Sequence, residues 1–220
     1  MVDEYLSERE QAEQLRHWLR ENWIWLVAGV ALTLGGFYGW RWWEARQFGR
    51  SAAAEAQFTA MVDAFAANQR EEALRIAGEL TSGYADTPYA DQATLVLARL
   101  DVEGGDLAKA RERLAQVMES ARDPELRLVA RLRLARVQLA EGQHDAALAT
   151  LDGAGAAAVE ARVLELRGDV LLAKGDRTGA LEAYRQAQAA AVDAGRAAAL
   201  VDAELLGLKI DELAAATATE

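Results

Sequence analysis

Hydrophobic and polar positions divide this chain into two parts. The first part contains an 18-residue run, Trp23 to Trp40, without a charged side chain, and Thr33 is its only clearly polar member. As a helix, with a rise of about 1.5 Å per residue, this run is roughly 27 Å long, which is close to the thickness of a bilayer core. We therefore predict one transmembrane helix over residues 23–43, preceded by a segment over 1–22.

Tryptophans mark both ends of this run. They form two groups: Trp18, Trp23 and Trp25, then Trp40, Trp42 and Trp43. Amphipathic rings favour the headgroup region, so the two groups are typical of the two membrane interfaces. A buried helix of a soluble protein would have no reason to place its tryptophans in this way. A cleaved signal peptide is also disfavoured, because the preceding segment is acidic and the run is too long.

Three small residues lie four positions apart on one face of the predicted membrane helix: Ala31, Gly35 and Gly39. Such a face lets another helix approach closely. The alternative is that glycine is simply common in membrane helices. Charge leaves the orientation open, because three arginines precede the helix and three follow it within a short distance.

After the apolar run, a pattern of small and large residues repeats. Its clearest copy consists of Leu164, Gly168, Leu171, Gly175, Ala180, Tyr184 and Ala187. Weaker copies place turn residues at Asn68, Gly105 and Gly142, so the four turns are separated by 37, 37 and 33 residues. The tetratricopeptide period is about 34 residues. In that pattern small residues sit where paired helices cross, and a left-handed glycine ends the first helix of a pair.

The fold class that we predict is therefore all-α. A tetratricopeptide-like α-solenoid of about four helix pairs over 44–214 ends in a C-terminal capping helix, with a frayed tail over 215–220. Asp106 and Asp176 follow turn glycines and can cap the next helix. The expected helices cover residues 42–67, 70–82, 89–103, 106–121, 124–141, 144–152, 157–174, 177–192 and 196–214. In the last of these, we expect four residues to cover the apolar edge of the solenoid: Leu205, Leu206, Leu208 and Ile210.

Composition supports helices and restricts the partners. Proline occurs twice, cysteine is absent, and the formal net charge is −11. Six of the 24 basic and seven of the 35 acidic residues precede Ser51. The part from Ser51 onward therefore has 18 basic and 28 acidic residues, and its net charge is −10. The negative electrostatic potential of this part repels the phosphates of nucleic acid, and we expect no nucleic-acid partner.

Catalytic and metal-binding patterns are missing from the sequence. The two histidines, His17 and His144, have no cysteine or second histidine at ligand spacing. No serine lies in a nucleophile elbow, and no glycine loop is followed by the Lys-Ser/Thr of a phosphate site. We expect no enzyme activity, no catalytic residue, no metal and no cofactor.

One basic cluster stands out in the acidic part of the chain. It lies near residues 122–141 and consists of Arg122, Arg127, Arg131, Arg133 and Arg136. Such a cluster can bind an acidic or carboxyl-bearing segment of a partner. The alternative, which we favour from sequence, is internal pairing with Glu119, Glu125 and acids on adjacent helices.

Several short segments resemble a known family. They are Glu21-Asn22, Gly29-Val30, Gly39-Trp40-Arg41 with Trp43, the stretch Leu132 to Gln138, and Leu166-Arg167-Gly168-Asp169 followed by Lys174-Gly175-Asp176. Together they resemble the ancillary subunit family of the bacterial Sec translocon, the YfgM-like tetratricopeptide proteins. The resemblance covers nearly the whole chain, with anchor and repeats in the same order.

This resemblance implies more than the physical patterns do. It implies an inner-membrane protein with a cytoplasmic N-terminus and a periplasmic repeat domain. Its expected partners are Sec translocon subunits and a membrane-anchored periplasmic chaperone of the prolyl-isomerase-related type, with the chain acting as an adaptor between them. The alternative function is a membrane-anchored scaffold for another cell-envelope complex, without client handling.

Overall fold

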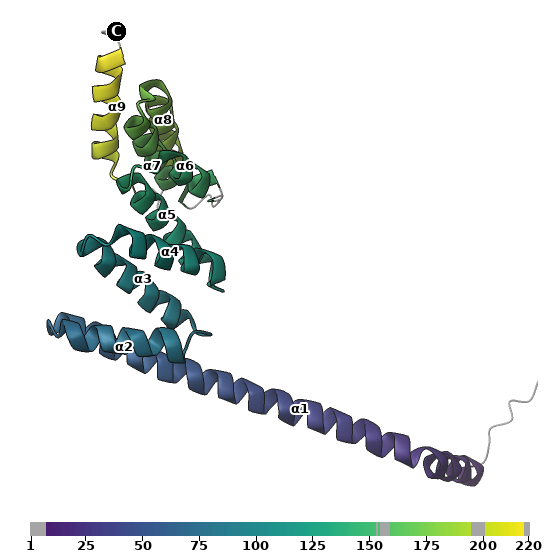
Figure 1. Cartoon of the computed structure of the whole chain (residues 1–220). Coiled ribbons are helices and arrows are strands. Elements are labelled where there is room, and N and C mark those ends of the chain that lie inside the picture. Colours follow the sequence, from purple (N-terminus) through teal and green to yellow (C-terminus); the bar gives the residue numbers. More distant parts are fainter. Residues whose placement is uncertain (1–7, 153, 155–158, 195–200, 218–220) are drawn as a thin grey trace, which may run out of the picture. The chain divides into compact units, whose positions relative to one another are not determined.

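The computed structural model describes residues 8–152, 154, 159–194 and 201–217, and helices account for nearly all of them (Figure 1). Two compact units are present, Met1–Ala52 and Ala53–Glu220. Helix α1 (Glu8–Ala66) begins in the first unit and ends in the second. The predicted helix over 42–67 is therefore the continuation of the apolar helix, as the sequence allowed.

In the second unit, consecutive helices pack against one another. After the end of α1 these helices are α2 (Arg70–Gly83), α3 (Pro88–Glu103), α4 (Leu107–Ser120), α5 (Pro124–Ala140), α6 (His144–Asp152), α7 (Glu160–Lys174), α8 (Arg177–Ala194) and α9 (Ala203–Thr217). Each helix from α2 onward contacts the next, and α3 also contacts α5, which contacts α7. The predicted α-solenoid of four helix pairs and a final helix is confirmed.

The turns within the pairs have the conformation that the sequence predicts. The backbone φ angle is +59° at Asn68, +82° at Gly105, +74° at Gly142 and +91° at Gly175. Glycine, and less often asparagine, adopts this left-handed conformation without a large steric cost. Among the described residues, Asn68 is the only non-glycine with a positive φ. The four repeat turns thus share one backbone geometry.

Aspartates begin the second helices of two pairs. The Asp106 carboxylate accepts a hydrogen bond from the Lys109 N–H at 3.1 Å, and Asp176 accepts one from the Gly179 N–H at 2.9 Å. Each carboxylate satisfies an N–H that has no partner within its own helix. Both caps were predicted from the sequence, and both are confirmed.

The hydrophobic core consists of successive clusters between neighbouring helices. One joins the end of α1, α2 and α3, the next α3, α4 and α5, the third α5, α6 and α7, and the last α7, α8 and α9. Small residues dominate these interfaces, and Ala73, Ala110, Ala135 and Ala180 are fully buried. Each helix pair is therefore stabilised mainly by its sequence neighbours, as in other solenoids.

The C-terminal helix differs from its prediction over 196–214. It begins at Ala203, because the Asp202 carboxylate accepts hydrogen bonds from the N–H groups of Glu204 and Leu205, both at 3.1 Å. It continues to Thr217, into the segment expected to be frayed. Residues 196–200 and 218–220, and the predicted helix start at 157–158, lie outside the described residues.

The burial of the apolar residues of α9 also differs in part from the prediction. Leu206 is fully buried and Ile210 packs against the last cluster, as expected. The prediction was wrong for Leu205 and Leu208, which are 47% and 62% exposed. Residues 206, 210 and 213 share one helix face, whereas 205 lies to its side and 208 lies on the opposite face.

Candidate membrane and partner-binding surfaces

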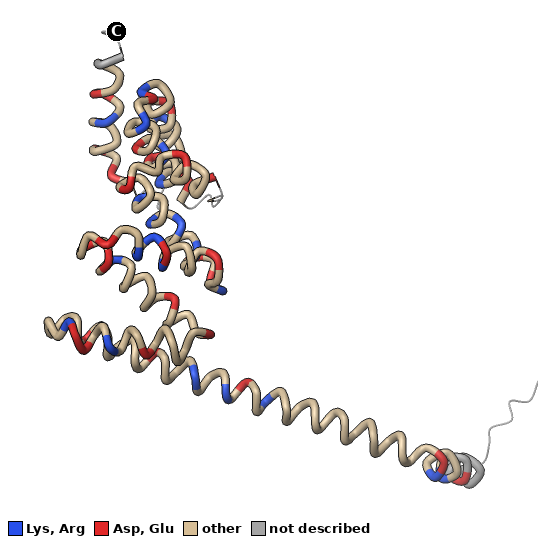
Figure 2. The backbone as a smooth tube through the Cα atoms, viewed as in Figure 1, with Lys and Arg blue, Asp and Glu red and all other residues tan. Residues whose placement is uncertain are grey.

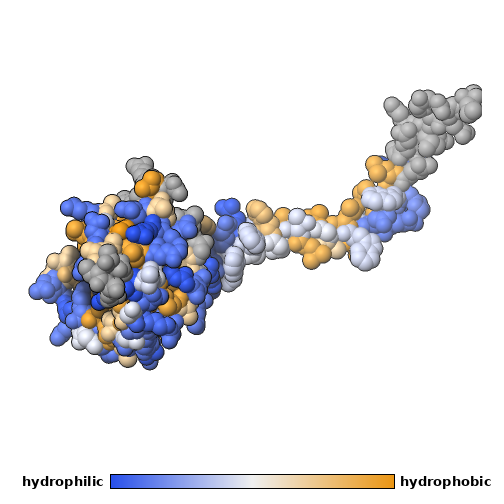
Figure 3. All heavy atoms as spheres, turned by 90° about the horizontal axis from the view of Figure 1, so that it is seen from above, coloured by the Kyte–Doolittle hydropathy of each residue, from blue (hydrophilic) through white to orange (hydrophobic). Residues whose placement is uncertain are grey.

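The apolar stretch of α1 is long and apolar enough to cross a membrane. No residue of its most apolar 18-residue window is buried inside the protein. Figure 2 shows this stretch without charges between charged segments, and Figure 3 shows its side chains in orange to white. The Thr33 hydroxyl donates a hydrogen bond to the Gly29 carbonyl at 2.8 Å, so its polar group is satisfied within the helix.

The tryptophans on α1 are all exposed, with side chains between 51% and 77% accessible. They are Trp18, Trp23, Trp25, Trp40, Trp42 and Trp43. Trp40 packs on Trp43 with ring centroids 5.7 Å apart, and the Arg46 guanidinium lies 5.5 Å from the Trp42 ring. Rings with an adjacent cation suit the boundary between lipid and water. Their role as interface anchors remains a prediction.

The small-residue face of α1 is open. Ala31, Gly35 and Gly39 are exposed, and a Cβ atom added at either glycine would meet nothing within 4 Å. The face can therefore accept another helix at short distance. Whether it does so remains a prediction.

Among the hollows in the described part of the solenoid, two lie on either side of α5. The first, of about 300 Å³, lies between α3, α4 and α5 and has apolar walls that include Val102, Leu114 and Val137. The second, of about 510 Å³, lies between α5 and the start of α7, with walls that include Leu128 and Leu132. Each hollow is large enough to take a bulky apolar side chain.

Arg133 and Arg136 border both hollows. Arg133 reaches the Leu95 carbonyl at the long distance of 3.5 Å. Burial and the nearby guanidinium groups of Arg162 and Arg133 lower the pKa of Arg136, against the attraction of Glu165 and Asp169. An arginine remains protonated even so, which leaves a positive charge between the two hollows.

The other members of the predicted basic cluster lie elsewhere. Arg127 donates a hydrogen bond to the Ala121 carbonyl at 3.4 Å, and Arg131 donates one to the Thr150 carbonyl on α6 at 3.3 Å. Neither borders a hollow, and neither does the exposed Arg122. The structure thus brings together only Arg133 and Arg136.

The internal pairing that we favoured from sequence is present in the described residues as longer-range attraction: Glu165 and Asp169 of α7 attract Arg136, and Arg122 and Asp91 of α3 attract each other. Within the described ranges, no ion pair joins an arginine of this cluster to Glu119, Glu125 or any other carboxylate. By contrast, Arg99 and Arg162, which also border the hollows, pair with Glu103 and Glu165 on their own helices. Two of the four arginines around the hollows therefore form no contact ion pair with a carboxylate in the part of the chain that the structure describes.

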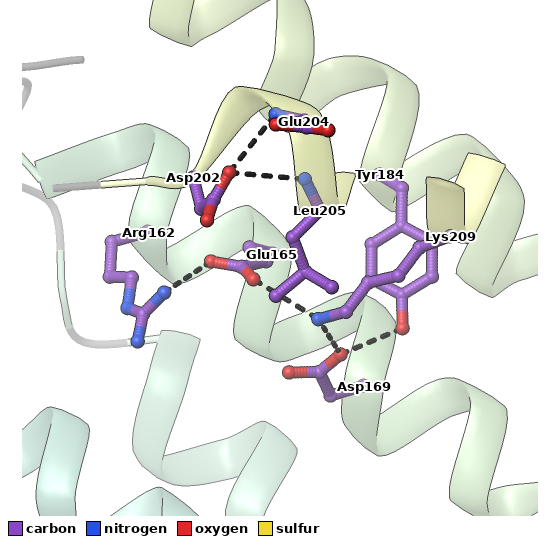
Figure 4. A network of polar contacts seen from close by, with 8 residues as sticks. All are labelled: Arg162, Glu165, Asp169, Tyr184, Asp202, Glu204, Leu205 and Lys209. Atoms are coloured by element: carbon purple, nitrogen blue, oxygen red, sulfur yellow. Dashed lines mark hydrogen bonds and ion pairs between the residues drawn. The ribbon is translucent and has the colours of Figure 1, made fainter. Parts of the chain in front are cut away.

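A polar network joins the last three helices (Figure 4). Glu165 on α7 is only 4% exposed and pairs with Arg162 and with Lys209 of α9, the latter at 3.0 Å. Lys209 also reaches Asp169 at 2.7 Å, and the Tyr184 hydroxyl donates a hydrogen bond to Asp169 at 2.8 Å. This network was not predicted from the sequence. The available signal was an acid on the core face of α7 and a lysine among the apolar residues of α9.

Metal binding finds no support in the described residues. They contain no group of three or more histidine, cysteine, aspartate or glutamate side chains placed to hold an ion. His17 lies 3.5 Å from Glu21 on the same exposed helix.

Comparison with known proteins identifies the family. The model of the tetratricopeptide repeat-like domain matches residues 16–215, which include both the apolar helix and the repeats. A protein of Escherichia coli strain K12 named ancillary SecYEG translocon subunit is 36% identical over 82% of this chain and 86% of its own length. A protein of the same name from Haemophilus influenzae is 31% identical over 83% of this chain and 89% of its own.

The chain belongs to the ancillary SecYEG translocon subunit family. A more distant member from Neisseria gonorrhoeae is 27% identical and extends the match to 95% of this chain and 98% of its own length. The resemblance found in the sequence is thus confirmed over both units.

Solved structures support the fold of this family member. A fragment titled MamA 41-end, from Desulfovibrio magneticus RS-1, has a TM-score of 0.51 at 18% identity, over 76% of this chain and 96% of its own. A kinesin light chain of Podosopora anserina with tetratricopeptide-like repeats reaches a TM-score of 0.50 at 19% identity, over 77% of this chain and 98% of its own. At these identities the likeness concerns the repeat fold alone.

Proposed function

We propose that this protein is an ancillary subunit of the bacterial Sec translocon, held in the inner membrane by α1. The family match across both the apolar helix and the repeats is the observation that carries this proposal. The unburied apolar window of α1 supplies a means of membrane attachment. The solenoid supplies a binding surface, because stacked helix pairs present extended faces to other proteins. The proposed role is binding, without catalysis.

The orientation that we propose places the N-terminus in the cytoplasm and the repeat unit in the periplasm. The absence of cysteine makes this testable with a matched pair of substitutions at exposed glutamates, Glu13→Cys and Glu112→Cys. A maleimide that cannot cross the inner membrane, added to spheroplasts, should label Cys at 112 and should label Cys at 13 only after lysis. The reverse labelling would contradict the orientation.

Within the periplasm, we propose that the repeat unit links the translocon to a membrane-anchored chaperone. Two sites on one chain raise the effective concentration of one partner near the other. The support for this role is the coexistence of an open membrane-helix face and a separate groove-bearing solenoid. The alternative is a scaffold of another envelope complex.

Affinity purification of a tagged translocon subunit tests the proposal. Tagged SecY, isolated in mild detergent from native membranes, should bring down this chain well above the level of an unrelated single-pass protein of equal abundance. The chaperone should increase in the same fraction when this chain is present and decrease when it is deleted. Absence of the chain from SecY fractions would reject the proposal. Its presence without any effect on the chaperone would reject the adaptor role only.

A further inference from the structure

The two arginines between the hollows form no contact ion pair in the described structure, although acidic residues outnumber basic ones in this part of the chain. Glu125 borders the second hollow, yet it forms no ion pair with Arg133 or Arg136 among the described residues. Glu165 is already paired with Arg162 and Lys209. Glu165 and Asp169 attract Arg136 at longer range, but both are in direct contact with Lys209 of α9.

The walls of the two hollows beside these arginines are mostly apolar. Leu128, Val129 and Leu132 face the second hollow on one side, and Val102 and Leu107 face the first on the other. Val102 is 41% exposed, so this apolar surface is accessible. A guanidinium beside an accessible apolar surface is typical of a protein–protein contact, where arginines bind carboxylates in forked pairs.

We propose that Arg133 and Arg136 bind an acidic segment of a partner protein, whose flanking apolar side chains enter the two hollows. This inference deepens the proposed function, on which it rests, by naming the surface and the chemistry of the partner. Charge complementarity favours an acidic occupant, because two arginines that form no contact ion pair within the described residues lie at the centre of the surface. A carboxylate there would also offset the repulsion between Arg136 and its neighbouring arginines.

The proposed partner segment has a defined sequence of charged and apolar side chains. One or two carboxylates lie over the arginines, and a large apolar side chain lies on each side of them. A segment with only carboxylates would leave the hollows unfilled. A purely apolar segment would bury the guanidinium groups without partners, which is costly.

Photo-crosslinking in native membranes tests this proposal with the full-length chain. A photoreactive phenylalanine analogue replaces Val102 in one variant and Leu128 in another, so that each hollow carries one probe. A third variant carries it at Val192, which is 77% exposed on α8 and borders neither hollow. Mass spectrometry then identifies the peptides that are attached at each position.

We expect the two hollow probes to capture the same partner segment, rich in Asp and Glu, which the probe at 192 does not capture. Combining each probe with Arg133→Glu and Arg136→Glu should lower the yield by at least about fivefold. The neutral pair Arg133→Gln and Arg136→Gln should lower it as well, in case charge reversal disturbs folding. Arg185→Glu makes the charge change of one of these reversals on the exposed surface of α8 and should leave the yield unaltered.

Four outcomes would overturn the proposal. They are captured segments without an acidic excess, a yield that does not respond to either arginine pair, a crosslink to a second copy of this chain, and no crosslink at the hollows while the probe at 192 reacts. If any of these occurs while SecY still brings down the chain, the binding surface is wrong and the translocon role stands. If SecY fractions also lack the chain, the proposed function itself fails.

Discussion

Gly168 of α7 lies against the ring of Tyr184 on α8. A Cβ atom at position 168 would lie 2.4 Å from Tyr184 Cε1, and the tyrosine is fully buried. We predict that Gly168→Ala lowers the free energy of unfolding by about 1–3 kcal/mol, the usual cost of overpacking a core. Urea titration of the full chain in mild detergent, followed by far-UV circular dichroism, measures this change. Tryptophan fluorescence does not report on the repeat unit, because all six tryptophans lie in residues 18–43.

Gly78→Ala provides the control. Gly78 is exposed within α2, and a Cβ atom there meets nothing within 4 Å. Alanine has the higher helix propensity, so this variant should be more stable by up to about 1 kcal/mol. Equal effects of the two substitutions would contradict the contact between Gly168 and Tyr184.

The network around Lys209 predicts a loss of stability in alkali. Burial, followed by the hydrogen bond to Asp169, raises the pKa of Tyr184 above its ordinary 10.0. Burial alone would lower the pKa of Lys209, but its bonds to Asp169 and Glu165 raise the pKa above its ordinary 10.5. Above about pH 10 the unfolded chain releases protons that the folded chain keeps, so stability falls as pH rises. Each group contributes up to about 1.4 kcal/mol per pH unit.

Urea midpoints between about pH 8 and pH 11 measure this dependence. The double variant Tyr184→Phe with Lys209→Met lacks both titrating groups and should be less stable at pH 8, with a shallower decrease toward pH 11. If the stability of the double variant decreased as steeply with pH as that of the unaltered chain, residues other than Tyr184 and Lys209 would cause the loss of stability in alkali.

At the scale of the helix pair, the turn residues set the path of the chain. Gly142 has a φ of +74°, and a Cβ atom there would meet nothing within 4 Å. The cost of Gly142→Ala is therefore the backbone cost alone, about 1–2 kcal/mol. Gly142→Asn should cost less, because Asn68 adopts the same conformation in the first pair. Comparing the urea midpoints of the two variants checks this prediction, and an alanine variant as stable as the asparagine variant would contradict it.

The capping helix α9 offers a matched set of leucines. Leu206 is fully buried in the last core cluster, whereas Leu208 is 62% exposed. We predict that Leu206→Ala costs about 2–5 kcal/mol and that Leu208→Ala costs less than about 0.5 kcal/mol. The free energy of unfolding of each variant measures the difference. Similar values would mean that α9 packs through another face.

The same helix shows what the sequence could and could not predict. The turns and the caps at Asp106 and Asp176 were predictable, because a left-handed glycine ends a helix through its own backbone and an aspartate directly after such a turn caps the next helix through its carboxylate. The face of α9 was not fully predictable, since several apolar residues in a row, such as Leu205 and Leu206, fit more than one face. The start at Ala203 depends on a cap at Asp202 that the apolar pattern does not show.

The candidate site was predictable only in part for a similar reason. Five arginines on or near one helix look equivalent in a sequence, but Arg127 and Arg131 lie outside the hollows that Arg133 and Arg136 border. Which arginine faces a hollow depends on the packing of α3 and α7 beside α5. The Glu165–Lys209 pair spans 44 positions and is visible only after folding.

At the scale of the whole molecule, the family match includes two units, each with its own kind of binding surface. The first carries an apolar helix with an open small-residue face, and the second carries a solenoid with two hollows. Partners held by both units would bind more tightly than either unit alone allows. This predicts that loss of one unit weakens the complex without abolishing every contact.

The most direct test of the account is affinity purification of this chain from native membranes in mild detergent. The unaltered chain is compared with one in which residues 23–43 are replaced by an unrelated transmembrane helix of equal length. We predict that SecY, SecE and SecG co-purify with the unaltered chain, and that the exchange reduces their recovery while the partner of the hollows remains. Recovery of a different envelope complex, with no translocon subunit in either sample, would contradict the account and leave only an anchored repeat scaffold.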